Sequence, residues 1–320
     1  AAIFHAESEV SVLNERGPIE PDCETVRPRG AGQGERAGAA VPSGAGMPGA
    51  DPHAATAGLA PAPTQSHWHA ESAWEPPRQP LPSAAPCVVI GGGLTGVGTA
   101  YWLNQRGVAC VLIEGRTLAG GASGRNGGVI SPTHAPLSRS FHEENIAHLV
   151  GVLEEQGIDC EYRVGGYLSL AYEGTDDAAS IGEDAEDDTM EYWDASKVKE
   201  ELGGAESFDV GGTPRKIAGG MFKHDSGHVW PAKLVQTLAK ACTDTTFCTH
   251  TVAQSLAPAG ADGRSVAITT SEGTVVAETV CVCTNGWAPR LLPGLGEAGA
   301  LHPVRNNVVM TAPAKTWSWP

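Results

Sequence analysis

Residues 87–131 constrain the fold of this chain most, because they combine buried-strand patterns with glycine spacing that only a few turns require. Residues 87–90, CVVI, form a short apolar run typical of a buried parallel strand. Gly91, Gly93 and Gly96 follow with the spacing G-x-G-x-x-G. In this motif the glycines allow a tight turn, a close approach of the backbone to a phosphate, and close packing of the next helix.

The segments after this glycine turn complete a nucleotide-binding unit. Residues 94–106 have apolar side chains at helical spacing, and the N-terminus of such a helix favours an anion. A second apolar run, residues 108–113, ends at Glu114, where a carboxylate can accept hydrogen bonds from ribose hydroxyls. The order predicts a strand–turn–helix–strand unit that binds a dinucleotide. The acid at position 114 argues against a 2′-phosphate, and therefore against NADP.

The first 86 residues differ in composition from the rest of the chain. They contain 13 of the 23 prolines and show almost no apolar periodicity. Such a segment buries too little surface to offset the entropy of ordering, so we expect a disordered Ala/Gly/Pro-rich leader, residues 1–86. His67 and His69 in this leader are interpreted as incidental. The leader is too acidic for a transit peptide, and a wrongly joined segment is the alternative explanation.

Charge, apolar runs and cysteines limit the partners and the compartment. The net charge is −16, and no basic stripe is present, so we expect no nucleic-acid partner. The acidic residues 176–188 are interpreted as a solvated surface insertion. No apolar run is long enough to predict a membrane span. The eight cysteines form no C-x-x-C pair, and the histidines show no metal-ligand spacing. We therefore expect reduced thiols, no metal, and an intracellular location: the cytoplasm first, an organellar matrix as the alternative.

Four segments carry a resemblance to a known family. Residues 120–128, GGASGRNGG, resemble the second glycine-rich loop of the D-amino-acid oxidase, glycine oxidase, sarcosine oxidase and gamma-glutamylputrescine oxidase group. Residues 225–241, 282–293 and 302–313 are similar to three later segments of that family, in the same order. The resemblance covers residues 87–320 and implies FAD, not NAD, as the cofactor. The chain ends at Pro320, so the resemblance implies that the family's last flavin and substrate contacts have no counterpart here.

The resemblance also assigns roles to individual positions. The glycine turn would hold the pyrophosphate, Glu114 the ribose, the second loop the pyrophosphate, ribityl chain and flavin edge, and the Val252 backbone the adenine. The expected cofactor-binding residues are Gly91, Gly92, Gly93, Leu94, Thr95, Gly96, Glu114, Gly115, Arg116, Ser123, Arg125, Asn126, Gly127, Gly128, Val252, Thr284, Asn285 and Gly286. His134, Tyr167 and Trp230 are near-flavin candidates for which packing is the favoured role, as it is for Trp287. No catalytic residue is assigned.

The expected fold class is α/β: a Rossmann-like FAD-binding domain with an inserted, mostly antiparallel α+β substrate domain and a disordered N-terminal leader. Residues 87–160 and 225–297 would form the FAD-binding domain. Residues 161–224 and 298–320 would form an incomplete substrate domain. The expected elements are helices at 137–156, 195–202 and 231–241, a strand pair at 161–172, a strand at 217–222, and a hairpin at 265–270 and 274–283.

Three functions remain open at this level. The first is an FAD-dependent oxidase of a small-molecule amine or amino acid. It would transfer a hydride from the C–H next to nitrogen to the flavin, water would hydrolyse the imine, and O2 would be reduced to hydrogen peroxide. The second is a flavin dehydrogenase that passes electrons to a quinone or carrier. The third is a non-catalytic nucleotide-binding remnant.

Overall fold

The computed structural model describes residues 2–4, 10–12, 66–72, 74–131, 139–175, 178, 189–210, 213–261, 263–297 and 301. Four expectations concern parts of the chain outside these residues. They are most of the predicted leader, nearly all of the acidic insertion 176–188, His134, and the segment 302–313.

A parallel sheet forms the centre of the larger lobe, as the two apolar runs predict. Its strands lie in the order β12 (Thr245–Cys248), β4 (Cys110–Ile113), β3 (Ala84–Ile90) and β15 (Gly273–Val282). Neighbouring strands in this series are parallel. The carboxyl ends of β3 and β4 therefore lie at one edge of the sheet, together with the end of β15, where Val282 pairs with Ile90.

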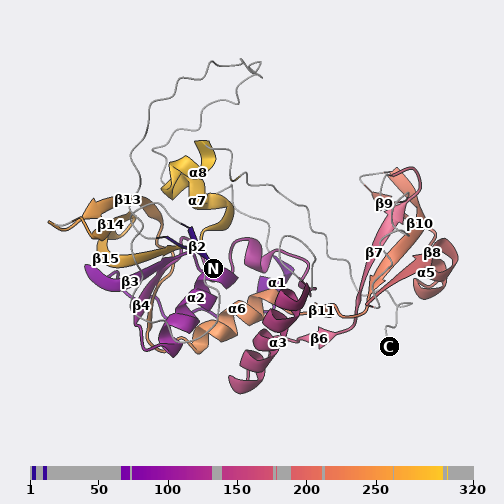
Figure 1. Cartoon of the computed structure of the whole chain (residues 1–320), viewed down its shortest axis with the longest axis horizontal. Coiled ribbons are helices and arrows are strands. Elements are labelled where there is room, and N and C mark those ends of the chain that lie inside the picture. Colours follow the sequence, from indigo (N-terminus) through magenta and orange to yellow (C-terminus); the bar gives the residue numbers. More distant parts are fainter. Residues whose placement is uncertain are drawn as a thin grey trace, which may run out of the picture.

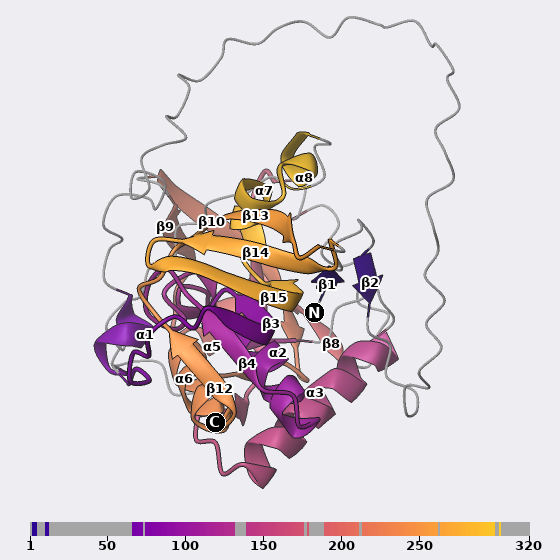
Figure 2. The ribbon, with the colours of Figure 1, turned by 90° about the vertical axis from the view of Figure 1, so that its left-hand side faces the viewer.

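The central strands are buried on both faces because alternate residues point to opposite sides. On one face, Cys87 and Val89 pack with α2 (Leu94–Gln105) and α6 (Pro231–Lys240). The other face is covered by β13 (Ala253–Ala259), β14 (Ser265–Thr270) and α7 (Ala288–Leu291). Figure 2 shows this arrangement, with β13 and β14 above β15 and β3, and α6 below those two strands. The hairpin predicted across residues 271–273 is the β14–β15 pair.

A second, smaller lobe is a mostly antiparallel sheet with one helix, and it lies apart from the larger lobe in Figure 1. Its elements are β7 (Tyr167–Tyr172), β8 (Met190–Asp194), α5 (Ala195–Glu201), β9 (Ser207–Val210) and β10 (Thr213–Lys223). Its own core includes Trp193 stacked on Phe222, with ring centroids 4.5 Å apart, and the fully buried Val198. The lobe corresponds to the expected inserted antiparallel domain.

A three-stranded sheet lies between the two lobes and corrects one prediction. It contains β5 (Val129–Ile130), β11 (Gly227–His228) and β6 (Arg163–Val164). The predicted strand pair at 161–172 is wrong, because β6 pairs with β11 and β7 pairs with β10. Gly166 separates them with a φ of +80°, and a Cβ there would lie 2.2 Å from the Phe222 ring. This left-handed turn sends the chain from one sheet into the other.

The remaining elements are short connections and one long surface helix. They are β1 (Ala2–Phe4), β2 (Val10–Val12), α1 (His67–Ala70), η1 (Ala122–Gly124), α3 (Arg139–Glu155), η2 (Asn285–Trp287) and α8 (Pro293–Glu297). In the part of the chain that the structure describes, no helix has the length and apolar character needed to cross a bilayer.

The last part of the predicted leader differs from the expectation. Residues 66–72 and 74–83, here called the strap, run along the larger lobe up to the start of β3. Gln79 covers the outer edge of β12, because its N–H donates to the Phe247 carbonyl and its Oε1 accepts from the Phe247 N–H, both at 3.0 Å. Single contacts of this kind leave no periodic pattern, which is why the composition did not predict them.

Candidate functional site

Three loops meet at the carboxyl ends of the parallel strands. They are the glycine turn after β3, the loop from Glu114 to Gly128 after β4, and residues 284–286 after β15. The Gly91 N–H donates to the Ile113 carbonyl at 2.8 Å, and the Cys283 N–H donates to the Ile90 carbonyl at 2.8 Å. In open α/β sheets this edge is where ligands bind. The geometry therefore brings the three predicted segments together.

The glycines of the first turn are required by space. Gly91 has a φ of +115°, and a Cβ there would lie 2.4 Å from the Cys283 carbonyl oxygen. A Cβ at Gly96 would lie 1.8 Å from the Gly91 carbonyl oxygen, so the first turn of α2 sits directly on the glycine turn. A Cβ at Gly93 would lie 2.8 Å from Ser123 Oγ. Because the glycines have no side chains, a pyrophosphate can approach the backbone N–H groups at the N-terminus of α2.

Glu114 is held in place by main-chain donors. Its Oε2 accepts from the Gly92 N–H and its Oε1 from the Arg116 N–H, each at 2.7 Å. Burial raises the pKa of this carboxyl, while the two N–H donors and the charge of Arg116 act in the opposite direction. Each carboxylate oxygen can accept more than one hydrogen bond. The fixed carboxylate thus retains acceptor positions for the two hydroxyls of a ribose.

The loop after β4 is fixed to the glycine turn and to itself. Ser123 Oγ accepts from the Leu94 N–H at 2.9 Å, and the Ala119 N–H donates to the Gly92 carbonyl at 2.9 Å. Asn126 braces the loop, because its Nδ2 donates to the carbonyls of Ala122 and Ser123 and its Oδ1 accepts from the Gly128 N–H. The Asn126 side chain therefore shapes the loop from within.

Arg116, Arg125 and the unpaired hydroxyl of Thr284 are the polar groups that could bind an anion at this edge. Burial, followed by the charge of Arg116, lowers the pKa of Arg125, whose Nε donates to the Gly120 carbonyl at 3.3 Å. Three described side-chain atoms are buried without a hydrogen-bond partner: Arg116 Nη2 and Thr284 Oγ1 at this edge, and Trp193 Nε1 in the smaller lobe. Buried polar atoms are normally paired, and guanidinium groups bind phosphate. The residues present therefore fit a phosphorylated ligand such as FAD.

The residues that the resemblance assigns to the adenine and to the returning chain have the following surroundings. The Val252 N–H donates to Ser271 Oγ at 3.0 Å, and the Val252 carbonyl accepts from the Ser271 N–H at 2.9 Å. An adenine amino group would therefore use the second lone pair of that carbonyl. Gly115 lies beside Val252, with 3.4 Å from its Cβ position to Val252 Cγ2. Asn285 begins η2 with a φ of +49°, next to the buried Thr284 hydroxyl.

Exposure separates the base of the site from its rim. Gly92, Gly96 and Gly128 are buried beneath the loops. The exposed predicted residues form the rim along the sheet edge: Leu94, Thr95, Asn126, Gly127 and Asn285. Gly128 needs its left-handed φ of +73°, because a Cβ would lie 2.6 Å from the Val229 carbonyl oxygen.

The near-flavin candidates that the structure describes have different surroundings. Trp230 Nε1 donates to the Trp68 carbonyl at 2.9 Å, and the two indole rings lie 5.1 Å apart. These contacts support the packing role for Trp230. Tyr167, at the start of β7, is 39% exposed. Trp287 is 38% exposed, with the Arg290 guanidinium 4.6 Å from its ring centroid.

Sequence reasoning missed the strap residues that contact the second loop. Ser66 and Trp68 donate hydrogen bonds to it, and His69 donates to the carbonyl of Ala119 directly before it. The only signal in the sequence is the aromatic cluster HWH at 67–69 within an otherwise small-residue segment.

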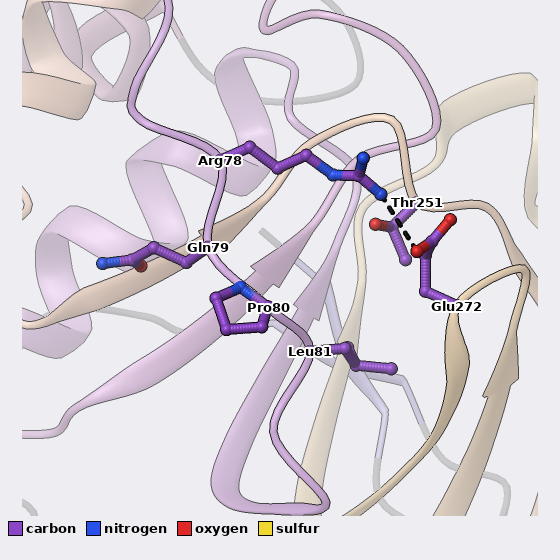
Figure 3. Close-up of a pocket in the computed structure, with 6 residues that line it drawn as sticks. All are labelled: Arg78, Gln79, Pro80, Leu81, Thr251 and Glu272. Carbon is purple, nitrogen blue, oxygen red and sulfur yellow. Dashed lines mark ion pairs between the residues drawn. The ribbon is translucent and has the colours of Figure 1, made fainter.

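A separate hollow lies between the strap and the β14–β15 turn. Its volume is about 270 Å³, and it is lined by Arg78, Gln79, Pro80, Leu81, Thr251 and Glu272. Figure 3 shows the ion pair between Arg78 and Glu272, 3.1 Å long, at its mouth. None of these residues belongs to the three loops. The hollow nevertheless adjoins the predicted cofactor edge, because the Thr251 N–H donates to the Glu114 carbonyl at 2.8 Å and Thr251 directly precedes Val252.

Comparisons with known proteins agree with this geometry. OrdL of Haemophilus influenzae, described as a probable oxidoreductase, is 26% identical over 263 residues, covering 74% of this chain and 58% of that protein. The glycine oxidase of Geobacillus kaustophilus is 24% identical over 235 residues, covering 69% and 60%. The structure of L-amino acid deaminase from Proteus myxofaciens in complex with anthranilate has a TM-score of 0.51 at 26% identity, covering 68% of this chain and 49% of that chain.

The chain thus spans 60% or less of the length of these three proteins. The family model described as FAD dependent oxidoreductase, abbreviated DAO, matches residues 87–320. This match includes more than half of the chain and all three loops of the site. The chain belongs to the DAO family of FAD-dependent oxidoreductases, and FAD is its expected cofactor.

Proposed function

We propose that this chain provides the cofactor-binding part of an FAD-dependent oxidase of an amine or amino acid. A hydride leaves the C–H bond next to nitrogen, the nitrogen lone pair forms the C=N bond, and water hydrolyses the imine. Bound FAD would supply the two-electron acceptor for this oxidation, and O2 would be reduced to hydrogen peroxide. The glycine oxidase match supports an amino acid or amine as substrate.

The observation that carries the proposal is the Glu114 carboxylate, fixed by two N–H donors beside a glycine turn where a Cβ at Gly91 or Gly96 would clash with backbone. In this proposal the N–H groups at the start of α2 bind the pyrophosphate, and Glu114 binds the ribose hydroxyls. Arg116 and Arg125 offset the phosphate charge. The rim residues of the second loop and residues 284–286 lie along the rest of the cofactor. The smaller lobe, together with residues 298–320, forms the substrate side.

The first test is the visible absorption spectrum of the purified chain, recorded before and after adding FAD and gel filtration. We expect two flavin bands that remain with the protein. Gly93→Asp places a carboxylate where the pyrophosphate binds, so the bands should be lost. Gly98→Asp is the matched control, because it adds the same charge to α2 at a position with no atom within 4 Å of the new Cβ. Binding of NAD in preference to FAD, or a coloured Gly93→Asp protein, contradicts the proposal.

The reaction itself is tested with a panel of amino acids and amines under anaerobic conditions. We expect one class to bleach the flavin bands, and readmitted air to restore them with formation of hydrogen peroxide. Bleaching without peroxide, combined with reduction of an added quinone or dye, favours a dehydrogenase. A chain that holds FAD and is bleached by no amine argues for a binding protein without turnover.

A further inference from the structure

The strap makes a row of contacts with the second loop, defined here with Ala119 included, as residues 119–128. Ser66 Oγ donates to the Gly124 carbonyl at 2.5 Å, and Trp68 Nε1 donates to the Asn126 carbonyl at 2.8 Å. His69 Nε2 lies 3.0 Å from the Ala119 carbonyl oxygen. Because a carbonyl only accepts, His69 carries its proton on Nε2. Three strap donors thus bind three carbonyls of a single loop.

The strap is itself anchored to α6, which also contacts η1 in that loop. The buried Gln236 of α6 donates to the Ser72 carbonyl at 2.9 Å and accepts from the Ser72 hydroxyl. Trp230, at the start of α6, donates to the Trp68 carbonyl at 2.9 Å. Figure 1 shows α1 beside α6. The three donors therefore sit on a fixed support.

Packing makes the fit between strap and loop specific. A Cβ at Gly124 would lie 2.6 Å from His69 Nε2 and 2.3 Å from the Ala119 carbonyl oxygen. Glu75 adds a contact of opposite polarity, because its Oε2 accepts from the Leu118 N–H at 3.2 Å just before the loop. The strap thus matches the loop at a glycine and at three carbonyls, and matches the residue before the loop at one N–H.

The direction of these hydrogen bonds matters for an anion. The oxygen of a peptide group carries the negative end of its dipole, so a carbonyl that faces a pyrophosphate repels it. A carbonyl held by a donor from the strap points its negative end at the strap and keeps its own hydrogen bond. Preorganisation of this kind reduces the ordering that binding must otherwise supply.

We propose that Ser66, Trp68 and His69 are positioning residues, which hold the carbonyls of Gly124, Asn126 and Ala119 and so set the second loop for FAD. The proposal rests on the proposed cofactor site, and it assigns a role to a segment that lies before the family match. The strap acts only through the loop and touches no reacting atom.

Single-donor substitutions in the full chain test this role. Trp68→Phe keeps an aromatic ring and removes the N–H, and His69→Leu removes the imidazole donor. Each should raise the FAD dissociation constant of the apoprotein about threefold to tenfold, the effect of one lost hydrogen bond. His69→Gln restores an N–H donor and should stay within about twofold of wild type. Trp74→Phe is the control, because Trp74 lies in the strap but contacts Lys240 of α6.

Two further readouts separate positioning from general stability. Adenosine should bind all variants with unchanged affinity, because it has no phosphate and in the proposed site contacts Glu114 and Val252 and not the second loop. Hydrogen exchange of the FAD-free protein should become faster at residues 119–128 in Trp68→Phe, and stay unchanged in β3 and β4.

The outcomes distinguish this inference from the proposed function. A wild-type chain that binds no FAD overturns the proposed function, while exchange at residues 119–128 still decides whether the strap orders the loop. Unchanged FAD affinity and unchanged exchange in Trp68→Phe and His69→Leu overturn the inference alone. Faster exchange throughout the larger lobe, with weaker adenosine binding, means that the strap only stabilises the fold, and this too overturns it.

Discussion

Gly96 and Gly98 of α2 lie two residues apart, and replacing each with alanine should have opposite effects on stability. Gly96→Ala would place its Cβ 1.8 Å from the Gly91 carbonyl oxygen, so the glycine turn must move. We expect a loss of FAD binding and a stability loss of about 2 kcal/mol or more, in the range of overpacked sites. Gly98→Ala meets no atom within 4 Å and should stabilise the helix by about 0.5–1 kcal/mol. Urea unfolding and FAD titration of both variants check this prediction, and equal effects would contradict it.

The carboxyl of Glu75 gives a prediction about pH. Burial raises the pKa of Glu75 from 4.5 to about 7, against the opposing hydrogen bond from the Leu118 N–H, and the charge of Glu114 adds to the increase. The folded protein therefore holds a proton that the unfolded chain releases near pH 4.5. The stability from this group is complete below pH 4.5 and is lost as the pH rises through about 7.

Glu75→Gln should remove that dependence. The difference in the pKa of Glu75 between the folded and the unfolded protein corresponds to about 3 kcal/mol of unfolding free energy. Partial contact of the carboxyl with solvent reduces this to about 1–2 kcal/mol. We expect wild type to lose this amount relative to Glu75→Gln between about pH 4.5 and 7 in urea unfolding. Parallel curves for the two proteins over that range would mean that Glu75 titrates normally.

At the scale of elements, α5 shows how a local cap supports the smaller lobe. Asp194 is its N-cap, and Asp194 Oδ1 accepts from the Lys197 N–H at 2.8 Å. Asp194→Ala should destabilise the lobe by about 1 kcal/mol, because a free N–H loses its partner. Asp194→Asn keeps an acceptor oxygen and should cost only a few tenths of that. Thermal unfolding of the two variants measures the difference, and an equal loss for both would point to the charge of Asp194.

The elements also show what sequence could predict. The strands β3 and β4 and the helices α2 and α6 were predicted because buried periodicity and the glycine spacing are local signals. The division of β6 and β7 between two sheets was missed, because it depends on the left-handed Gly166 and on the distant Phe222 ring. The strap was missed because its hydrogen bonds join residues 50 or more positions apart and need no periodic pattern.

At the scale of the whole molecule, the two lobes have separate cores. Buried residues of the smaller lobe cluster with one another, while the larger lobe has one cluster on each face of its sheet. Between them lies a sheet of three two-residue strands. Few apolar contacts cross such a connection, so we expect two unfolding transitions in urea.

Matched core substitutions should assign these transitions. Val198 and Val235 are both almost completely buried, the first in the smaller lobe and the second in α6 of the larger lobe. Val198→Ala and Val235→Ala each create a similar cavity and should cost about 2 kcal/mol. We expect each substitution to lower the midpoint of one transition only. A single transition that both variants shift equally would show that the lobes unfold together.

Adding FAD to the same urea unfolding experiment tests which lobe binds the cofactor. A ligand stabilises only the unit that binds it, by about 2.7 kcal/mol at a concentration one hundred times its dissociation constant. If the glycine turn, Glu114 and the second loop hold the cofactor, FAD should raise the transition that Val235→Ala lowers and leave the other in place. A shift of both transitions would mean that the smaller lobe closes on the cofactor, since only a contact across the short connecting sheet could stabilise both cores.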